Sequence, residues 1–276
     1  MKVSILKFAT LLILVVSSCF LNAQNSENYK FIRVEIAEKI SFFDIDSYGN
    51  IYTIEKNNII SKYTPQGKFL YSYSNPNYGT ITSFDISNPD KILIFYKDAA
   101  ILLILNEQFA PIINPINLFN LNYSNISLVA FTNSNTICIF DQSNYKLIML
   151  DLFLKEKSQF QLSNTQFNPI KMVTWGNHKI AIQDPQVGLI FFDKFGTIEK
   201  EIALLIPHDF QIYDSKILFL QDSMIQEYNF EKLEMLQTPL NELSPDVPIF
   251  KILKKSGTNL IGLDDQGVLY LGKKNF

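Results

Sequence analysis

The stretch ISFFDIDSYGNIYTIEKNNIISKYTPQGKFLYSYS, from Ile40 to Ser74, decides the fold class. It alternates four short apolar runs with three polar turns, and the first turn contains Gly49, which can adopt positive φ. Runs of β-branched and aromatic residues between such turns are typical of consecutive antiparallel strands. We therefore predict four strands, at residues 40–46, 51–56, 59–65 and 68–74.

The same unit recurs along the rest of the chain as a polar turn followed by an apolar strand that opens with Ile or Leu. The opening residues are Ile51, Ile92, Ile137, Ile180, Ile217 and Leu260. The spacings between them are 41, 45, 43, 37 and 43 residues. A repeat of this length with a purely β pattern is typical of one four-stranded propeller blade.

The last unit, residues 249–274, has only three predicted strands. A further strand at 30–36 stands before the first unit without a partner, and the four intermediate units span 81–118, 126–163, 169–204 and 208–240. Closing the ring with the N-terminal strand would remove the last open sheet edge. We therefore predict an all-β fold, a six-bladed β-propeller with four-stranded blades, in which the N-terminal strand completes the last blade and 241–248 is a connector.

Composition agrees with one globular domain. The chain has 276 residues, of which 47% are hydrophobic and 18% charged, and its formal net charge is -3. High apolar content and low net charge argue against a disordered chain. The acidic balance and the lack of basic clusters argue against nucleic acid as the main partner. We predict a single domain over residues 24–276.

Residues 1–23 have the pattern of a secretory signal peptide. Lys2 and Lys7 precede an apolar stretch, and Ala23 provides the small residue before a cleavage site. The sequence Val16–Cys19 also resembles a bacterial lipobox, in which Cys19 would be lipidated. Soluble export is the favoured prediction, because apolar residues follow Cys19 directly; a lipid anchor is the alternative, and it is the only membrane attachment expected.

The segment Phe43–Tyr52, FDIDSYGNIY, resembles the core of an NHL-type repeat, and residues 58–63 and 67–70 continue the pattern. The resemblance covers one blade; the other units keep the apolar skeleton but lose the turn motif. The signal peptide and the composition rich in Asn, Ile and Lys resemble exported propeller proteins of Bacteroidetes. NHL-like lyases use a histidine-rich metal centre, and this chain has only two histidines, so the resemblance does not imply that activity.

A polar position recurs four residues after each opening residue of the repeat. These positions are Glu55, Tyr96, Asp141, Asp184, Gln221 and Asp264. In a propeller they would lie at the ends of the second strands, on one face of the ring. We interpret them as a candidate rim for a partner or a cationic or hydroxyl-rich ligand; the alternative is that they only begin turns.

Motifs for chemistry are not found. The sequence has no nucleophile elbow, P-loop or Cys-x-x-Cys pair, and we predict no catalytic residues, no metal site and no cofactor. Asp44, Asp46 and Asn50 superficially resemble a calcium loop, but an ordinary turn is favoured. Cys138 is expected in the core, and Trp175 is an alternative candidate for a sugar platform.

These observations favour a non-catalytic exported binding or scaffold protein of the bacterial cell envelope, periplasmic or associated with the outer membrane. Its closed blades would display short loops to an envelope protein or a peptide. The alternatives are an enzyme acting on glycans through rim carboxylates, or a sensor that binds a small ligand. Enzymatic activity is the less favoured hypothesis, and a glycan remains an alternative partner.

Overall fold

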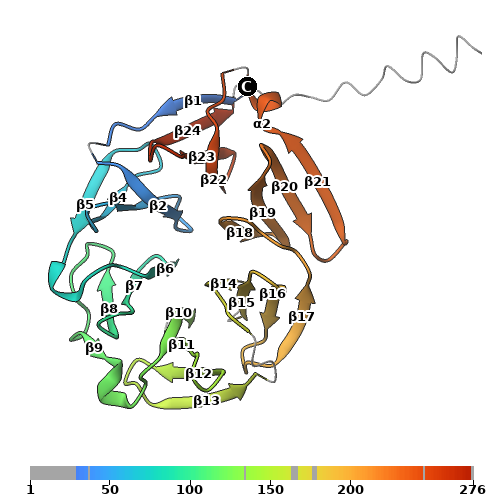
Figure 1. The fold of residues 1–276 in the computed structure, drawn as a ribbon. Coiled ribbons are helices and arrows are strands. Elements are labelled where there is room, and N and C mark those ends of the chain that lie inside the picture. Colours follow the sequence, from blue (N-terminus) through green and yellow to red (C-terminus); the bar gives the residue numbers. More distant parts are fainter. Residues whose placement is uncertain are drawn as a thin grey trace, which may run out of the picture.

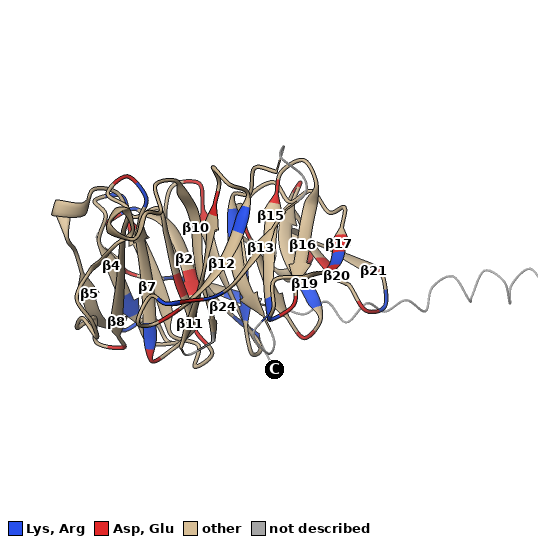
Figure 2. Ribbon diagram, turned by 90° about the horizontal axis from the view of Figure 1, so that it is seen from below, with Lys and Arg blue, Asp and Glu red and all other residues tan. Residues whose placement is uncertain are grey.

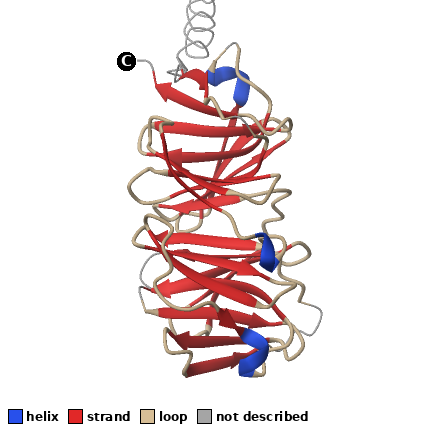
Figure 3. Ribbon diagram, turned by 90° about the vertical axis from the view of Figure 1, so that its left-hand side faces the viewer, coloured by secondary structure: helices blue, strands red, loops and turns tan. Residues whose placement is uncertain are grey.

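The computed structural model describes residues 29–36, 38–133, 135–162, 167–175, 179–244 and 246–274. They form six four-stranded antiparallel sheets arranged around a central axis (Figure 1). Seen from the side, the sheets make a flat disc (Figure 3). This confirms the prediction of an all-β, six-bladed propeller.

Strands follow one another from the axis outwards in each of the first five blades. Blade 1 contains β2 (Ile40–Ile45), β3 (Ile51–Glu55), β4 (Ile60–Tyr63) and β5 (Phe69–Tyr73). Blade 2 contains β6 (Ser83–Asn88), β7 (Lys91–Tyr96), β8 (Ile101–Asn106) and β9 (Ile116–Asn117). Blade 3 contains β10 (Ile126–Asn133), β11 (Thr136–Asp141), β12 (Lys146–Asp151) and β13 (Glu156–Gln161).

The second half of the ring repeats this order. Blade 4 contains β14 (Lys171–Trp175), β15 (Lys179–Asp184), β16 (Gly188–Phe192) and β17 (Ile198–Ile202). Blade 5 contains β18 (Phe210–Tyr213), β19 (Lys216–Gln221), β20 (Met224–Asn229) and β21 (Glu234–Pro239). Blade 6 contains β22 (Phe250–Ser256), β23 (Asn259–Asp264) and β24 (Leu269–Lys274), and its outer strand is β1 (Tyr29–Arg33).

The ring closes by pairing the two ends of the chain. Strand β1 pairs antiparallel with β24, from Tyr29 opposite Lys274 to Arg33 opposite Tyr270 (Figure 1). This confirms the predicted closure, in which the N-terminal strand supplies the missing strand of the last blade.

The helical segments of the described residues are short and lie between blades. They are η2 (Pro76–Tyr78), η3 (Leu118–Leu121) and α2 (Leu240–Leu243). Helix α2 overlaps the predicted connector 241–248 between blades 5 and 6. No helix in the described part of the chain is long and apolar enough to cross a membrane.

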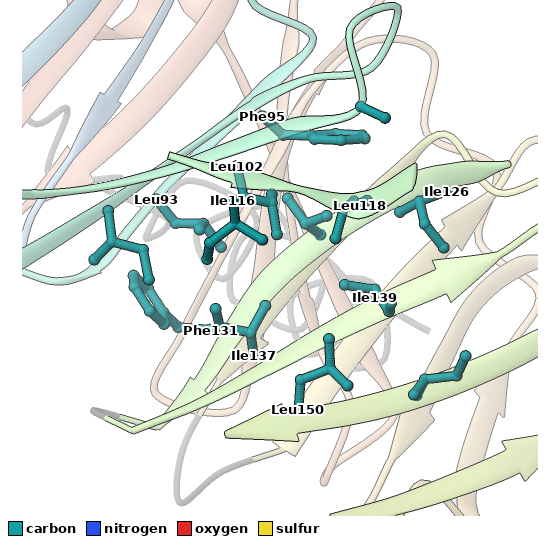
Figure 4. Packing of buried hydrophobic residues seen from close by; sticks show 14 residues of the cluster. Leu93, Phe95, Leu102, Ile116, Leu118, Ile126, Phe131, Ile137, Ile139 and Leu150 are labelled. Carbon is teal, nitrogen blue, oxygen red and sulfur yellow. The ribbon is translucent and has the colours of Figure 1, made fainter. Parts of the chain in front are cut away.

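The hydrophobic core is divided among the spaces between neighbouring blades. Between blades 2 and 3, for example, Leu93 and Phe95 pack near Phe131, Ile137 and Ile139, all of them almost fully buried (Figure 4). Five further clusters occupy the other interfaces around the ring. Burial of this apolar surface fixes each blade against the next, so that the inner strands hold stable positions around the axis.

Candidate functional site

A cavity of about 810 Å³ lies at the centre of the ring. Its walls come from the innermost strand of every blade, β2, β6, β10, β14, β18 and β22, together with residues that flank them. Along the ribbon, acidic and basic residues are interspersed over the strands and turns of the disc (Figure 2). The cavity is therefore where side chains from all six blades come together.

A buried network of ion pairs crosses one side of the cavity. The ammonium group of Lys254, on β22, lies 2.7 Å from Oδ1 of Asp44 on β2 and 3.1 Å from Oδ2 of Asp209. Asp209, which directly precedes β18, also pairs with Lys171 on β14. Lys171 further donates to the carbonyl oxygen of Phe210, at 3.2 Å. Four blades are thus joined by one chain of alternating charges.

Burial and neighbouring charges oppose each other in this network. Burial alone would raise the pKa of Asp209, but the charges of Lys171 and Lys254 outweigh it and hold the pKa below its ordinary value. Burial lowers the pKa of Lys171, and the charge of Lys254 adds to this effect. For Lys254, burial is outweighed by Asp209 and Asp44, which raise its pKa. Lys254 is therefore the firmly charged centre of the network.

Aromatic rings border the two lysines. The ammonium group of Lys254 lies 5.0 Å from the ring centroid of Phe42, and that of Lys171 lies 5.7 Å from the same centroid. The ring of Phe84 meets Phe42 edge-on at 5.8 Å. These rings form an apolar wall beside the charges and contribute cation–π attraction.

Asp85, on β6, is a third carboxylate of the cavity lining. Its Oδ1 accepts the backbone N–H of Ser87 at 2.7 Å, and its Oδ2 accepts that of Phe131 at 2.6 Å. Burial raises its pKa most strongly and the charge of Asp44 raises it further, whereas hydrogen bonds from the backbone and side chain of Ser87 and from the backbone of Phe131 act in the opposite direction. Asp85 is thus held in place by neutral groups of blades 2 and 3.

The predicted rim residues all occupy the ends of the second strands, as the repeat implied. They are the last residues of β3, β7, β11, β15, β19 and β23, namely Glu55, Tyr96, Asp141, Asp184, Gln221 and Asp264. The first four are buried, Gln221 is exposed and Asp264 is half-buried. The lining of the central cavity includes none of these six described residues.

Several of these carboxylates accept backbone hydrogen bonds in the turn that follows the strand. Asp141 accepts the backbone N–H groups of Ser143 and Asn144, at 3.0 and 3.1 Å. Asp184 and Asp264 cap the following turns in the same way. Glu55 instead accepts the hydroxyl of Ser61 at 2.7 Å. Partner binding by this rim stays a prediction, and the structure adds a turn-forming role.

The structure also shows the contacts of three other residues that the sequence singled out as candidates. Asp46 accepts the backbone N–H groups of Tyr48 and Asn50, at 2.9 and 2.8 Å, as expected for an ordinary turn. The Trp175 ring packs edge-on against Phe191 at 5.2 Å. Cys138 is fully buried, and burial raises the pKa of its thiol. The signal peptide 1–23 and Cys19 lie outside the described residues.

Sequence reasoning missed the charged residues of the cavity. A lysine within a strand pattern normally indicates a solvent-exposed side chain, so Lys171 and Lys254 gave no distinctive signal. Asp44 and Asp85 did share a signal, because each lies seven residues before the opening residue of its repeat. Extending the alignment of the units from the second strands back to the inner strands would have placed the two carboxylates at equivalent positions.

No protein-family model matches the sequence, and no curated protein matches it significantly. Solved structures share the fold at low identity. The Pan2 WD40 domain of Neurospora crassa aligns with a TM-score of 0.63 and 10% identity, over 92% of this chain and 97% of that chain. A streptogramin B lyase aligns with a TM-score of 0.60 and 11% identity, over 92% and 100%. BBS1N aligns with a TM-score of 0.50 and 16% identity, over 87% and 79%. The propeller fold is shown, whereas the NHL resemblance stays a prediction.

Proposed function

We propose that this protein is a non-catalytic binding protein of the bacterial cell envelope, exported by residues 1–23, which holds a protein or peptide partner at its central cavity. The observation that carries the proposal is the convergence of six inner strands on one cavity of about 810 Å³, with charged side chains fixed by contacts between blades. A preorganised site of this kind loses little conformational entropy when it binds.

The fold is compatible with this role and with others. BBS1N was solved in complex with ARL6DN, whereas another protein of similar fold is a streptogramin B lyase. A glycan-acting enzyme based on the rim has less support, because Asp141 and Asp184 are buried and their oxygens accept turn N–H groups. Binding at the cavity uses groups that the ring already holds in place.

Ile170 offers a way to test the mouth of the cavity. Its side chain lines the cavity and yet is 52% exposed, and its backbone N–H donates to the carbonyl oxygen of Gln183 at 2.9 Å. It therefore lies beside the start of β14, at the end where the second strands finish. An exposed apolar residue at the opening of a cavity is well placed to contact a partner.

The experiment is affinity capture of the tagged, full-length protein from gently crosslinked native cells, with soluble and membrane fractions kept apart. A stoichiometric envelope partner is expected, and Ile170→Glu should remove it. Phe195→Glu is the matched control, since Phe195 is an exposed apolar residue in the turn between β16 and β17. Recovery of no specific partner, or equal loss in both variants, would overturn the proposal.

A further inference from the structure

Each blade contributes one residue near the start of its inner strand to a ring around one end of the cavity. In five blades this residue directly precedes the inner-strand residue that lies opposite the next-to-last residue of the second strand. The register of β18 with β19 gives the same position to His208 in blade 5. We call these six lining residues the mouth ring: Ser41, Thr82, Ser127, Ile170, His208 and Lys251. Four of the six are exposed, so this end of the cavity is open to solvent.

A recurring β-bulge places three members of the mouth ring. The pairing between inner and second strand shifts by one residue at the same place in blades 1, 3 and 6. The extra residues are Ser41, Ser127 and Lys251, and all three line the cavity. A bulged residue is left out of the ladder of strand pairs, and bulges often redirect a side chain beside a functional site. The mouth ring is therefore an irregular feature that three blades share at one level.

Two serine hydroxyls at this level lack a hydrogen-bond partner. Ser127 is 6% exposed, and its buried Oγ has no partner among the described residues. The same holds for the buried Oγ of Ser83, which directly follows the ring residue of blade 2 and also lines the cavity. Buried hydroxyls are normally paired, so both are available to donate to a bound group. Gln183 Oε1 also lacks a partner within the described chain, but it can only accept and does not belong to this donor set.

Two lysines at this end of the cavity carry unpaired charge. Lys251 belongs to the mouth ring and is half-buried. Lys97 directly follows β7 and also lines the cavity, and its backbone N–H donates to Oγ1 of Thr82 at 3.1 Å, which holds Lys97 beside the ring. Neither ammonium group has an ion-pair partner among the residues that the structure describes. Both charges are therefore free to attract an anion.

The carboxylates of the described lining do not cancel this charge. Asp209 directly follows the ring residue of blade 5, but it already pairs with Lys171 and Lys254. Asp44 and Asp85 each lie three residues farther along the inner strand than the ring residue of their blade, a distance of about 10 Å at a rise of about 3.3 Å per residue. The carboxylates of the predicted rim are not part of the lining. Positive charge is therefore in excess around the mouth ring.

We infer that the mouth ring binds a carboxylate, carried by an aspartate or glutamate side chain of the partner. This inference rests on the proposed binding function and names the chemistry recognised there. Lys251 and Lys97 supply positive charge, and the hydroxyls of Ser127 and Ser83 supply donors for the carboxylate oxygens. Ile170, exposed within the same ring, provides an apolar contact for the residues that flank the acidic side chain.

NMR titration of the purified, isotope-labelled protein with three short peptides tests the inference. Acetyl-Leu-Asp-Leu-amide is compared with acetyl-Leu-Asn-Leu-amide, in which a neutral amide of the same shape replaces the carboxylate. The third peptide is acetyl-Leu-Asn-Leu with a free C-terminus, which carries its carboxylate on the backbone. We expect saturable binding of the Asp peptide, at least about tenfold tighter than that of the neutral peptide. Tighter binding of the peptide with the free C-terminus would overturn the assignment to a side chain.

Variants locate the site. Lys251→Gln should weaken binding of the Asp peptide about tenfold. Lys68→Gln is the matched control and should leave it unchanged, since Lys68 is exposed in the turn before β5 and is not part of the lining. Lys97→Gln, at an exposed residue, should weaken binding by a smaller factor and serves if Lys251→Gln does not fold. Ser127→Ala keeps every charge and should weaken binding about threefold.

Three results would overturn the inference: no saturable binding of the Asp peptide, equal binding of the neutral peptide, or no effect of either lysine variant. Capture of a partner that is lost in Ile170→Glu, together with any of these results, would leave the proposed function standing.

Discussion

The Nζ of Lys254 lies 2.7 Å from Oδ1 of Asp44, although 210 positions separate the two residues in the sequence. Lys254 belongs to the last blade and Asp44 to the first, so this contact joins two blades that are neighbours only because the ring is closed. Lys254 is 1% exposed, which makes it one of the most deeply buried charges in the described chain. Its partners are therefore essential for its burial.

Replacing Lys254 with Met should destabilise the protein by about 3–5 kcal/mol, because Asp209 would lose one of the two cations, and Asp44 the one cation, with which each pairs among the described residues. Urea unfolding followed by circular dichroism measures the change. Lys255→Met is the control, since Lys255 lies 4.0 Å from Glu227 with a partly exposed side chain and should contribute at most about 1 kcal/mol. Equal free energies of unfolding for the two variants would contradict a stabilising role for the network.

Asp85 should give the protein a distinctive dependence on pH. Burial, followed by the charge of Asp44, raises its folded-state pKa above the ordinary value of 3.8. Ionisation of Asp85 at neutral pH therefore destabilises the folded state. This destabilisation disappears as the pH falls through the raised pKa towards 3.8. The stability of the wild type relative to Asp85→Asn should accordingly increase on acidification.

Urea unfolding of both proteins, from about pH 7 to about pH 4, measures this difference. Asp209, whose pKa is lowered, contributes in the opposite direction, but it is present in both proteins and cancels in the comparison. A relative stability that stays constant or falls on acidification would show that the pKa of Asp85 is not raised in the folded protein.

Gly188, the first residue of β16, should not tolerate a side chain. Its φ is +108°, and an added Cβ would lie 2.3 Å from the carbonyl oxygen of Ile202. Gly188→Ala should therefore cost about 3 kcal/mol in the free energy of unfolding. Gly257→Ala provides the matched control, because Gly257 also has positive φ but an added Cβ would have no neighbour within 4 Å. Gly257→Ala should lower the free energy of unfolding by only about 1 kcal/mol. A similar decrease in both variants would argue against a clash at Gly188.

Cys19 decides between two predicted forms of the exported protein. We expect that Cys19→Ala leaves the protein soluble and exported, because the apolar residues after Cys19 are atypical of a lipobox. Immunoblots of periplasmic and membrane fractions from cells expressing each form measure the distribution. A shift of the protein from the membrane fraction to the soluble fraction in the variant would instead support lipidation.

The fold could be predicted because its signal is local and repeated. Ile51 is the first residue of β3, and each of its equivalents is the second residue of the second strand of its blade, because period-two alternation and turn residues report directly on strand and turn. The cavity could not be predicted in the same way. The partners Lys254 and Asp44 are brought together only by ring closure, and nothing in the residues around Lys254 distinguishes it from an exposed strand lysine.

The rim residues show a second limit of prediction from the sequence. Their position at the ends of the second strands followed from the repeat, but the direction and burial of each side chain depend on the turn that follows. Asp141 is buried because its oxygens accept N–H groups of residues 143 and 144, whereas Gln221 is exposed at the equivalent position. Sequence spacing placed these residues on one face without revealing which atoms remain free.

Ring closure by β1 should contribute strongly to stability. Phe31, in the middle of this strand, packs 5.2 Å from the ring of Phe250, and it lies over Gly272, where an added Cβ would come within 2.5 Å of the Phe31 ring. Deleting residues 24–33 removes these contacts and exposes the edge of β24. We expect a clear fall in melting temperature together with association through the open edge, because an unpaired strand edge can pair with another chain.

Deletion of residues 24–28 is the control, since it leaves all five pairs between β1 and β24 in place. Phe31→Ala separates packing from pairing: it keeps the backbone hydrogen bonds and should cost about 2 kcal/mol, with no association. Thermal unfolding and size-exclusion chromatography measure both effects. If the longer deletion melts at the same temperature as the control and stays monomeric, pairing of β1 with β24 does not hold the ring closed, and the contact between Lys254 and Asp44 must do so without it.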